Sequence, residues 1–137
     1  MDMTDCIFCK IVKGEIPSYK VYEDDETLAF LDISPNNPGH TLVIPKEHFE
    51  NIYSLPGELF ARMSLTAQKV SIALKNGLST DGVTLSMNNE PAGGQLVFHS
   101  HIHVIPRMKD DFTVHYPHKT YGEGEAEEIL EKIKAEI

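Results

Sequence analysis

The sequence predicts one α+β domain, with a mainly antiparallel sheet of five strands, one long helix and a C-terminal helix. Short apolar or alternating segments bounded by Pro, Gly, Asn and Asp recur through the first 107 residues, which is typical of strands joined by turns. Within these 107 residues one long segment, 56–76, repeats its apolar residues at helical spacing. The chain has 137 residues, 41% of them hydrophobic, which is enough for one core.

The first predicted elements form a hairpin. "SYKVYEDDETLAFLDIS" indicates strands over 19–23 and 27–32, joined by an acidic turn. "SPNNPGH" has the composition of a loop, and the apolar "HTLVIP" is a third strand that ends at Pro45. His40 therefore lies where this strand begins.

A long amphipathic helix is predicted over 56–76, ending at Asn76 and Gly77. We expect its apolar stripe to cover one face of the sheet. The stripe consists of Leu59, Met63, Ala67, Val70 and Leu74.

Two more strands and a second helix complete the prediction. "GVTLSMNN" (82–89) and "QLVFHSHIHVIP" (95–106) read as strands connected through "EPAGG". The segment 123–137 has an apolar stripe opposite charged residues, so a surface helix is expected there. Residues 1–137 are thus predicted to be one domain with its core at about 6–107 and a C-terminal extension over 108–137.

The charge and the N-terminus limit the possible surroundings of the protein. A net charge of -9 disfavours binding to nucleic acid, which needs a basic surface. No segment has the roughly 18–20 uninterrupted apolar residues of a membrane span, and "MDMTDCIFCK" lacks the basic start of a signal peptide. We therefore expect a cytoplasmic protein without membrane partners.

The segment "FHSHIHVIPR" (98–107) places His99, His101 and His103 at alternate positions of an apolar run. In a strand these three side chains share one face. Such a face suits a metal ion, or a phosphoryl group attacked by an imidazole nitrogen. Buried histidines without a function would require the desolvation of several polar groups. The nearby "AGGQ" (92–95) offers the backbone N–H groups that bind phosphate oxygens.

The segment "HSHIHVI" (99–105) resembles the H-φ-H-φ-H-φ-φ signature of the histidine triad (HIT) superfamily, with Ser100 less apolar than the pattern. The likeness extends to "CIFCKIVKGEIP", "LAFLDISPNNPGHTLVIPKEH" and "NNEPAGGQ", in this order over roughly 6–107. These segments are similar to the Hint-like branch common among bacteria. The resemblance implies the HIT fold and a homodimer whose sheets join, with the long helix at the interface.

The resemblance implies a hydrolase or transferase that acts on the α-phosphate of nucleoside phosphoramidates or related conjugates. His101 matches the nucleophile, which forms a covalent nucleotidyl-histidine intermediate that water resolves. His103 would bind the phosphate oxygens, and His99 and His40 complete the catalytic set. We expect the second ring nitrogen of His101 to donate to a backbone carbonyl.

The resemblance also implies a purine nucleotide as ligand. Asp32 matches the acid that accepts the ribose hydroxyls, and Asn88 the amide at the phosphate. The backbone from Gly94 through Gln95 to Leu96 would stabilise negative oxygens. The residues that match the apolar purine pocket are Phe8, Ile11, Ile16, Phe30 and Ile33.

Leu96 departs from the family pattern, in which Ser or Thr usually follows "GQ". The backbone N–H persists, but a hydroxyl that would touch the phosphate or the leaving group is missing. The rate or the leaving-group preference is expected to differ accordingly.

The two cysteines, Cys6 and Cys9, form a C-x-x-C, which is a zinc half-site. Two histidines would close a tetrahedral set, and the resemblance implies His48 and His99, hence a structural zinc site. Two ordinary thiols are the other interpretation, whereas a redox motif would need a thioredoxin-like context that the sequence lacks. His115 and His118 match no motif and are expected to be exposed.

Three other functions are compatible with the sequence. The first is hydrolysis of dinucleoside polyphosphates. The second is a zinc-containing regulatory or scaffold protein that binds nucleotide with little turnover, which the absence of a hydroxyl at Leu96 favours. The third is a hydrolase that uses the three histidines directly as ligands of a catalytic metal.

Overall fold

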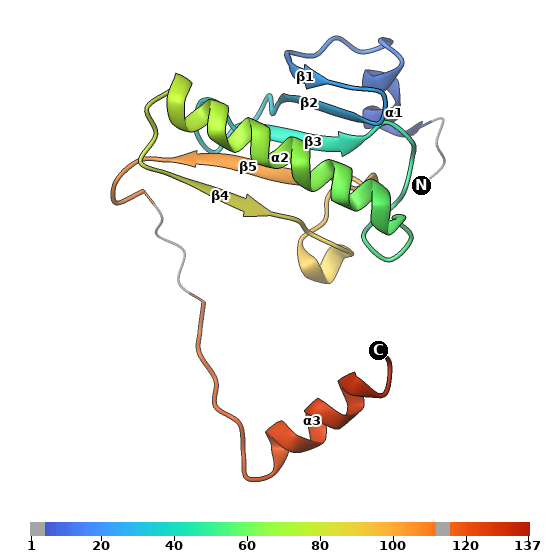
Figure 1. The fold of residues 1–137 in the computed structure, drawn as a ribbon, viewed down its shortest axis with the longest axis vertical. Coiled ribbons are helices and arrows are strands. Elements are labelled where there is room, and N and C mark those ends of the chain that lie inside the picture. The colour runs from blue at the N-terminus through green and yellow to red at the C-terminus, as the bar shows by residue number, and fades with distance from the viewer. Residues whose placement is uncertain (1–4, 112–115) are drawn as a thin grey trace.

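The computed structural model describes residues 5–111 and 116–137. Its strands form one antiparallel sheet in the order β1-β2-β3-β5-β4, with α2 across one face (Figure 1). The predicted α+β class and the five-stranded sheet are confirmed. The elements are α1 (Ile7–Val12), β1 (Lys20–Glu23), β2 (Thr27–Leu31), β3 (Thr41–Pro45), α2 (Gly57–Gly77), β4 (Gly82–Ser86), a 3₁₀ turn η2 (Pro91–Gly93), β5 (Ile102–Arg107) and α3 (Glu125–Lys134).

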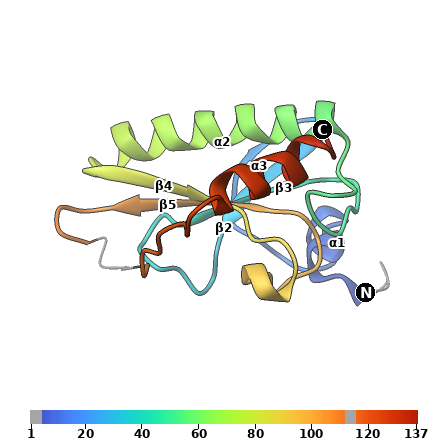
Figure 2. The ribbon, with the colours of Figure 1, turned by 90° about the horizontal axis from the view of Figure 1, so that it is seen from below.

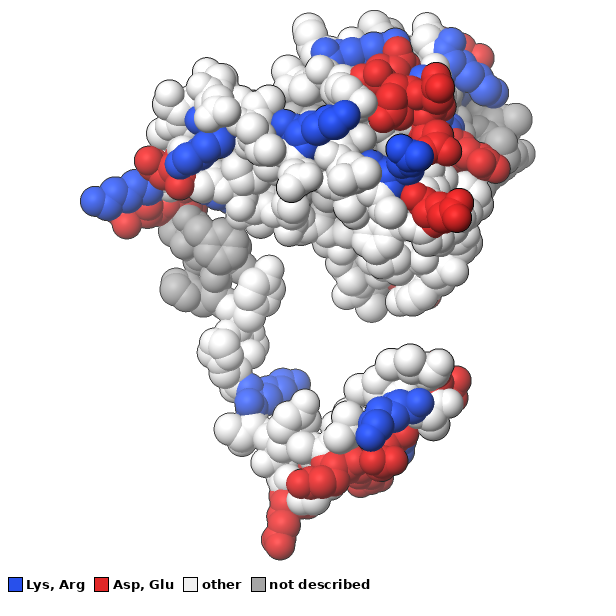
Figure 3. All heavy atoms as spheres, in the orientation of Figure 1, with Lys and Arg blue, Asp and Glu red and all other residues white. Residues whose placement is uncertain are grey.

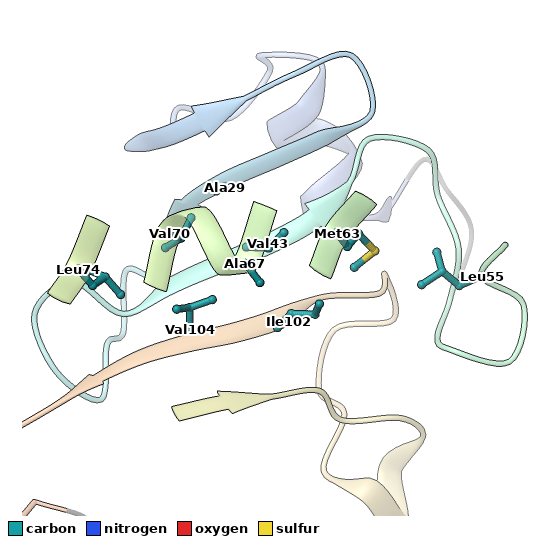
Figure 4. Packing of buried hydrophobic residues seen from close by; sticks show 9 residues of the cluster. All are labelled: Ala29, Val43, Leu55, Met63, Ala67, Val70, Leu74, Ile102 and Val104. Atoms are coloured by element: carbon teal, nitrogen blue, oxygen red, sulfur yellow. The ribbon is translucent and has the colours of Figure 1, made fainter. Parts of the chain in front are cut away.

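The larger core lies between α2 and the sheet, as the helical stripe predicts (Figure 4). The buried hydroxyls of Thr27 on β2 and Thr66 on α2 lie 2.8 Å apart and add a polar link across this core. Burial of these apolar side chains fixes α2 on this face. The cluster consists of Ala29, Val43, Leu55, Met63, Ala67, Val70, Leu74, Ile102 and Val104.

A second core covers the opposite face of β2 and β3, where α1 packs (Figure 2). Alternate strand residues divide between the two cores. Leu28 and Phe30 join the α1 side, whereas Ala29 between them joins the α2 side. The strand "TLAFL" is apolar throughout because both of its faces are covered.

The strand predicted over 95–106 is wrong in its first half, because β5 begins only at Ile102. Two of the preceding residues bond to the loop that follows β3. The N–H of Ser100 donates to the carbonyl of Phe49 at 2.7 Å, and the side-chain amide of Gln95 donates to the carbonyl of Glu50. Of the histidines in this segment, only His103 lies in a strand.

The strand predicted over 82–89 is also shorter, since β4 ends at Ser86. Asn89 lies beyond it and accepts a hydrogen bond from the N–H of Ile52. Polar side chains that bond to loop backbone end the strand at this point.

The C-terminal helix α3 forms near its predicted place, and every residue over 116–137 is exposed. The helix lies apart from the sheet (Figure 1). His118 is exposed as predicted, whereas His115 lies outside the described residues. No helix in the described part of the chain combines the length and hydrophobicity needed to cross a membrane.

Candidate active site and metal centre

A cavity of about 300 Å³ opens between α1, the sheet and the segment that precedes β5. Its lining is mostly apolar, with a few polar side chains that converge from distant parts of the sequence. It includes all the residues predicted to bind nucleotide except Gln95. The lining residues from that prediction and from the triad are Phe8, Ile11, Ile16, Phe30, Asp32, Ile33, Asn88, Gly94, Leu96, His101 and His103.

Two aromatic side chains shape the closed part of this cavity. Phe8 on α1 packs edge to face against Phe30 on β2, with ring centroids 5.5 Å apart, and against His101 at 5.2 Å. Both phenyl rings are buried. The cavity therefore has a flat apolar wall next to an imidazole.

His101 has a defined tautomer. Its Nδ1 lies 2.7 Å from the carbonyl oxygen of His99. Because a carbonyl only accepts, Nδ1 carries the proton and Nε2 keeps its lone pair. Burial lowers the pKa of this imidazole, although the hydrogen bond to His99 and the charge of Asp32 oppose the change. At neutral pH His101 is therefore a neutral imidazole with a fixed orientation and a free lone pair on Nε2.

Hydrogen bonds fix the tautomers of His40 and His103, which form one hydrogen-bonded chain. The N–H of Asn36 donates to Nδ1 of His40 at 3.1 Å, which leaves the ring proton on Nε2. That atom lies 3.0 Å from Nδ1 of His103 and 3.7 Å from a carboxylate oxygen of Asp32. His103 thus accepts at Nδ1 and carries its own proton on Nε2. Its Nε2–H is a hydrogen-bond donor for an anion.

Both rings of this chain are neutral. Burial, followed by the charges of His101 and His40, lowers the pKa of His103 to about 4. Burial also lowers the pKa of His40, against the opposing effect of Asp32. Donation from His103 therefore does not require a charged imidazole.

Asp32, His40 and His103 are close enough for their ligand atoms to surround an ion. The proton order disfavours this, because an ion at Nε2 of His40 would force the proton onto Nδ1, which faces the N–H of Asn36. His101 uses Nδ1 for the carbonyl of His99. The three triad histidines do not converge on one ion, so the catalytic-metal hypothesis is not favoured by this donor set.

The segment after η2 brings backbone groups to the cavity. Gly94 adopts a left-handed conformation with φ of 90°, and the side-chain amide of Asn88 approaches its carbonyl at 3.4 Å. A side chain at Gly94 would meet this amide at 3.5 Å. The turn thus places Gly94 and Asn88 together at the wall of the cavity.

Gln95 does not line the cavity. It is buried, and its side-chain amide donates to the carbonyls of Glu50 and Val97 while its oxygen accepts from the N–H of Glu90. These bonds attach the turn to the loop before α2. Gln95 holds the neighbouring residues in place instead of contacting a ligand through its side chain.

Leu96 and Ile33 lie at the mouth of the cavity. Their side chains are 87% and 83% exposed, respectively. Ile33 is therefore an outer residue of the apolar pocket rather than part of its buried wall. Leu96 presents an apolar side chain at the position where the family pattern has Ser or Thr.

A second cluster lies behind the cavity. The ligand atoms of Cys6, Cys9, His48 and His99 all lie within 4.8 Å of one another. Nδ1 of His99 is 3.4 Å from Sγ of Cys6, 3.6 Å from Sγ of Cys9 and 3.2 Å from Nδ1 of His48. The predicted Cys₂His₂ set is thus assembled in the structure.

The chemistry of this cluster fits a zinc ion. Zinc bonds of about 2.0–2.3 Å place tetrahedral ligands roughly 3.3–3.8 Å apart, close to these separations. Nε2 of His99 lies 2.8 Å from the carbonyl of Pro45, so it carries the proton and Nδ1 is available as a ligand. Burial raises the pKa of the Cys9 thiol to about 11 when no cation is present. Four protein ligands would make the site closed and structural.

Sequence reasoning missed several contributors to the site. Leu42 on β3 and Ile7 on α1 line the cavity. Leu42 is the register partner of His103, so the strand pairing would have identified it. The backbone N–H of Asn36 orients His40, and only the loop conformation reveals that contact.

The comparisons agree with this architecture. The sequence matches the HIT domain family over residues 13–110. A solved HIT-family structure from Bacillus subtilis has a TM-score of 0.90 at 41% identity and covers 97% of both chains. A Zn-bound histidine triad family structure from Mycobacterium smegmatis has a TM-score of 0.78 at 34% identity and covers 99% of this chain and 100% of that one. Adenylylsulfatase HINT3 of Arabidopsis thaliana is 43% identical over 107 residues, which are 78% of this chain and 54% of that protein. The chain belongs to the HIT domain family.

Proposed function

We propose that this protein is a nucleotide-binding hydrolase or transferase that cleaves the bond between the α-phosphorus and the leaving group of nucleoside phosphoramidates. The observation that carries the proposal is the His101 imidazole, which lines the cavity and donates its Nδ1–H to the carbonyl of His99. A neutral imidazole with a defined lone pair is a competent nucleophile toward phosphorus.

The reaction has two displacement steps. Nε2 of His101 bonds to the α-phosphorus, the P–N bond breaks, and the leaving amine departs with a proton taken from solvent. Water then attacks the phosphorus and returns a proton to solvent, the bond to His101 breaks, and a nucleoside monophosphate is released. The net change is hydrolysis of one P–N bond by one water, with His101 regenerated.

The groups around His101 are hydrogen-bond donors suited to the negative charge that develops on the phosphate oxygens. The Nε2–H of His103 and the backbone N–H groups of the 94–96 segment would donate to the phosphate oxygens. His40 is a positioning residue, because it holds the tautomer of His103. Donors fixed in place before the reaction stabilise the transition state without reorganisation.

The rest of the cavity would hold the nucleoside. A purine fits between apolar walls such as Phe8 and Phe30, with Ile11 and Ile16 around it. One carboxylate oxygen of Asp32 accepts from the N–H of Ser34. Its other oxygen is available to accept from ribose hydroxyls. The adenylylsulfatase name of the Arabidopsis relative supports an adenylyl group as the transferred part.

We also propose that zinc occupies the Cys6, Cys9, His48 and His99 cluster. The convergence of the four donors and the Zn-bound relative support this assignment. When bound, zinc would supply structural cross-links and no chemistry at phosphorus.

Two rival functions are less well supported. Dinucleoside polyphosphates carry several charges, yet among the described residues the cavity lining contains no Lys or Arg. A nucleotide-binding regulator with little turnover is favoured by Leu96, which offers no hydroxyl at the mouth. A measurement of turnover distinguishes this second rival from the proposed function.

The test is intact-protein mass spectrometry after mixing with adenosine phosphoramidate, combined with an assay for released AMP. We expect one adenylyl group on His101, and a loss of AMP release of at least ~10³-fold in His101→Asn. The exposed His118 provides the matched control, because His118→Asn should retain both signals. An adduct on another residue, or undiminished release by His101→Asn, would contradict the proposal.

A further inference from the structure

We propose that binding of a metal ion to Cys6, Cys9, His48 and His99, here called the cation cluster, controls nucleotide binding. The cluster holds both the α1 wall of the cavity and the backbone that orients His101. This inference rests on the proposed function. It assigns to the zinc site a regulatory role in addition to its structural one.

The first connection runs through α1. Cys6 caps the helix and Cys9 lies in its first turn, so both thiols anchor the same six-residue element. Residues between and beside them, including Ile7, Phe8 and Ile11, line the cavity. A change in the position of α1 therefore moves three cavity-lining side chains together.

A helix of this length is unstable in isolation, so its position depends on what it is attached to. In the described part of the chain, the hydrogen bonds that connect α1 with distant residues all involve the thiols of Cys6 and Cys9. Thiol hydrogen bonds are weak, whereas bonds to a divalent cation are strong. The remaining anchor is the apolar packing around Phe8 and Ile11.

The second connection runs through His99. Its Nδ1 faces the two thiols and His48, while its carbonyl receives the Nδ1–H of His101. The residue that would bind the ion thus also sets the tautomer and direction of the nucleophile. Fixing the side chain of His99 restrains the carbonyl on the same residue.

Phe8 joins the two connections. Its ring packs edge to face against His99 at 5.8 Å and against His101 at 5.2 Å. Loss of the ion would loosen α1 and His99 together, and Phe8 touches both. We therefore expect the cavity to lose its shape while α2 and the larger core beneath it, which share no residue with the core around α1, remain folded.

The experiment compares the full-length protein loaded with Zn²⁺ and after removal of the ion by a chelator. The measurements are the dissociation constant for AMP, the far-UV circular dichroism, and hydrogen exchange of the α1 amides. We expect chelation to weaken AMP binding by about tenfold, since the wall and the nucleophile must then be ordered on binding. Exchange over α1 should accelerate while the dichroism changes little.

Variants of His48 distinguish the effect of losing the ion from that of damaging the cavity. His48→Ala removes a ligand that belongs neither to α1 nor to the cavity lining, so it should reproduce the effect of chelation and show no further loss with chelator. His48→Cys restores four ligands and should restore AMP binding in Zn²⁺. His118→Ala, an exposed position, should behave as the wild type.

AMP affinity within twofold between the loaded and the chelated protein would overturn the inference. Global unfolding on chelation would also overturn it, because the ion would then hold the whole domain. A loaded protein that binds no AMP is a different result, since it refutes the proposed function itself. The exchange measurement needs no nucleotide and still reports whether the ion fixes α1.

Discussion

Hydrogen bonding gives four chemically identical side chains different roles. His99 donates through Nε2 to Pro45 and offers Nδ1 to the cation cluster, whereas His101 donates through Nδ1 and keeps Nε2 free. His40 and His103 each accept at Nδ1. In each case one backbone or imidazole partner decides which nitrogen carries the proton.

Leu96 provides a prediction at this scale. Leu96→Ser adds a hydroxyl at the mouth of the cavity, where it can donate to a phosphate oxygen or to the leaving group. We expect kcat for adenosine phosphoramidate to rise, by up to about tenfold, because one more donor acts on the transition state. The unfolding temperature should be unchanged, since the side chain is 87% exposed.

Leu96→Ala is the matched control, because it removes the apolar bulk without adding a donor. If the Ser and Ala variants have equal kcat, steric access explains the effect and the missing hydroxyl does not.

At the scale of elements, the loop before β3 positions His40 by packing under the end of α2. Gly39 has φ of 100°, and a Cβ there would lie 2.6 Å from Cδ1 of Leu78 and 3.2 Å from Cδ2 of Leu74. The end of α2 and the left-handed backbone together require glycine. Because His40 follows directly, this turn also positions His40 for its hydrogen bond to His103.

Gly39→Ala is therefore expected to lower the free energy of unfolding by about 1–3 kcal/mol in urea denaturation. Turnover should fall as well, because His40 shifts relative to His103. Gly77→Ala is the control, since Gly77 lies within α2 and no atom lies within 4 Å of an added Cβ. That variant should be neutral or stabilised by up to ~1 kcal/mol. Equal stability of the two variants would refute the role assigned to Gly39.

For the whole molecule, the structure leaves an unpaired sheet edge and an apolar surface beside it. β4 is an edge strand, and Leu85 on it and Leu65 and Ile72 on α2 are more than half exposed. Acidic side chains gather instead at the end of the domain with the β1–β2 turn (Figure 3). A second copy meeting this face would pair the edge strands and bury the apolar side chains.

We therefore expect a homodimer through β4 and α2. Leu85→Lys should weaken it by at least about tenfold, because a lysine at an edge strand opposes pairing. The measurement is light scattering coupled to size exclusion over a range of concentrations. Val21→Lys is the control, since Val21 is a 43% exposed residue on β1, the opposite edge of the sheet. Dissociation by Val21→Lys with an intact Leu85→Lys dimer would place the interface elsewhere.

Local patterns in the sequence determined the α+β class, the long helix and the identity of the donor residues. The stripe from Leu59 to Leu74 and the continuous apolar run "TLAFL" both indicate burial, because side-chain direction follows from backbone geometry. The C-x-x-C and the alternating histidines identify chemistry for the same reason: few residue types can perform it.

Only the tertiary structure decided how these donors are divided. The alternation of faces holds within a hydrogen-bonded strand, but β5 begins only at Ile102, and Ser100 and Gln95 bond to the loop at Phe49 and Glu50. His99 is therefore directed to the cation cluster, while His101 and His103 line the cavity. Gln95 is buried and attaches its turn to the loop before α2 through its hydrogen bond to Glu50, so its side chain does not face the cavity. Partners far apart in the chain set these outcomes, and no periodicity in the sequence encodes them.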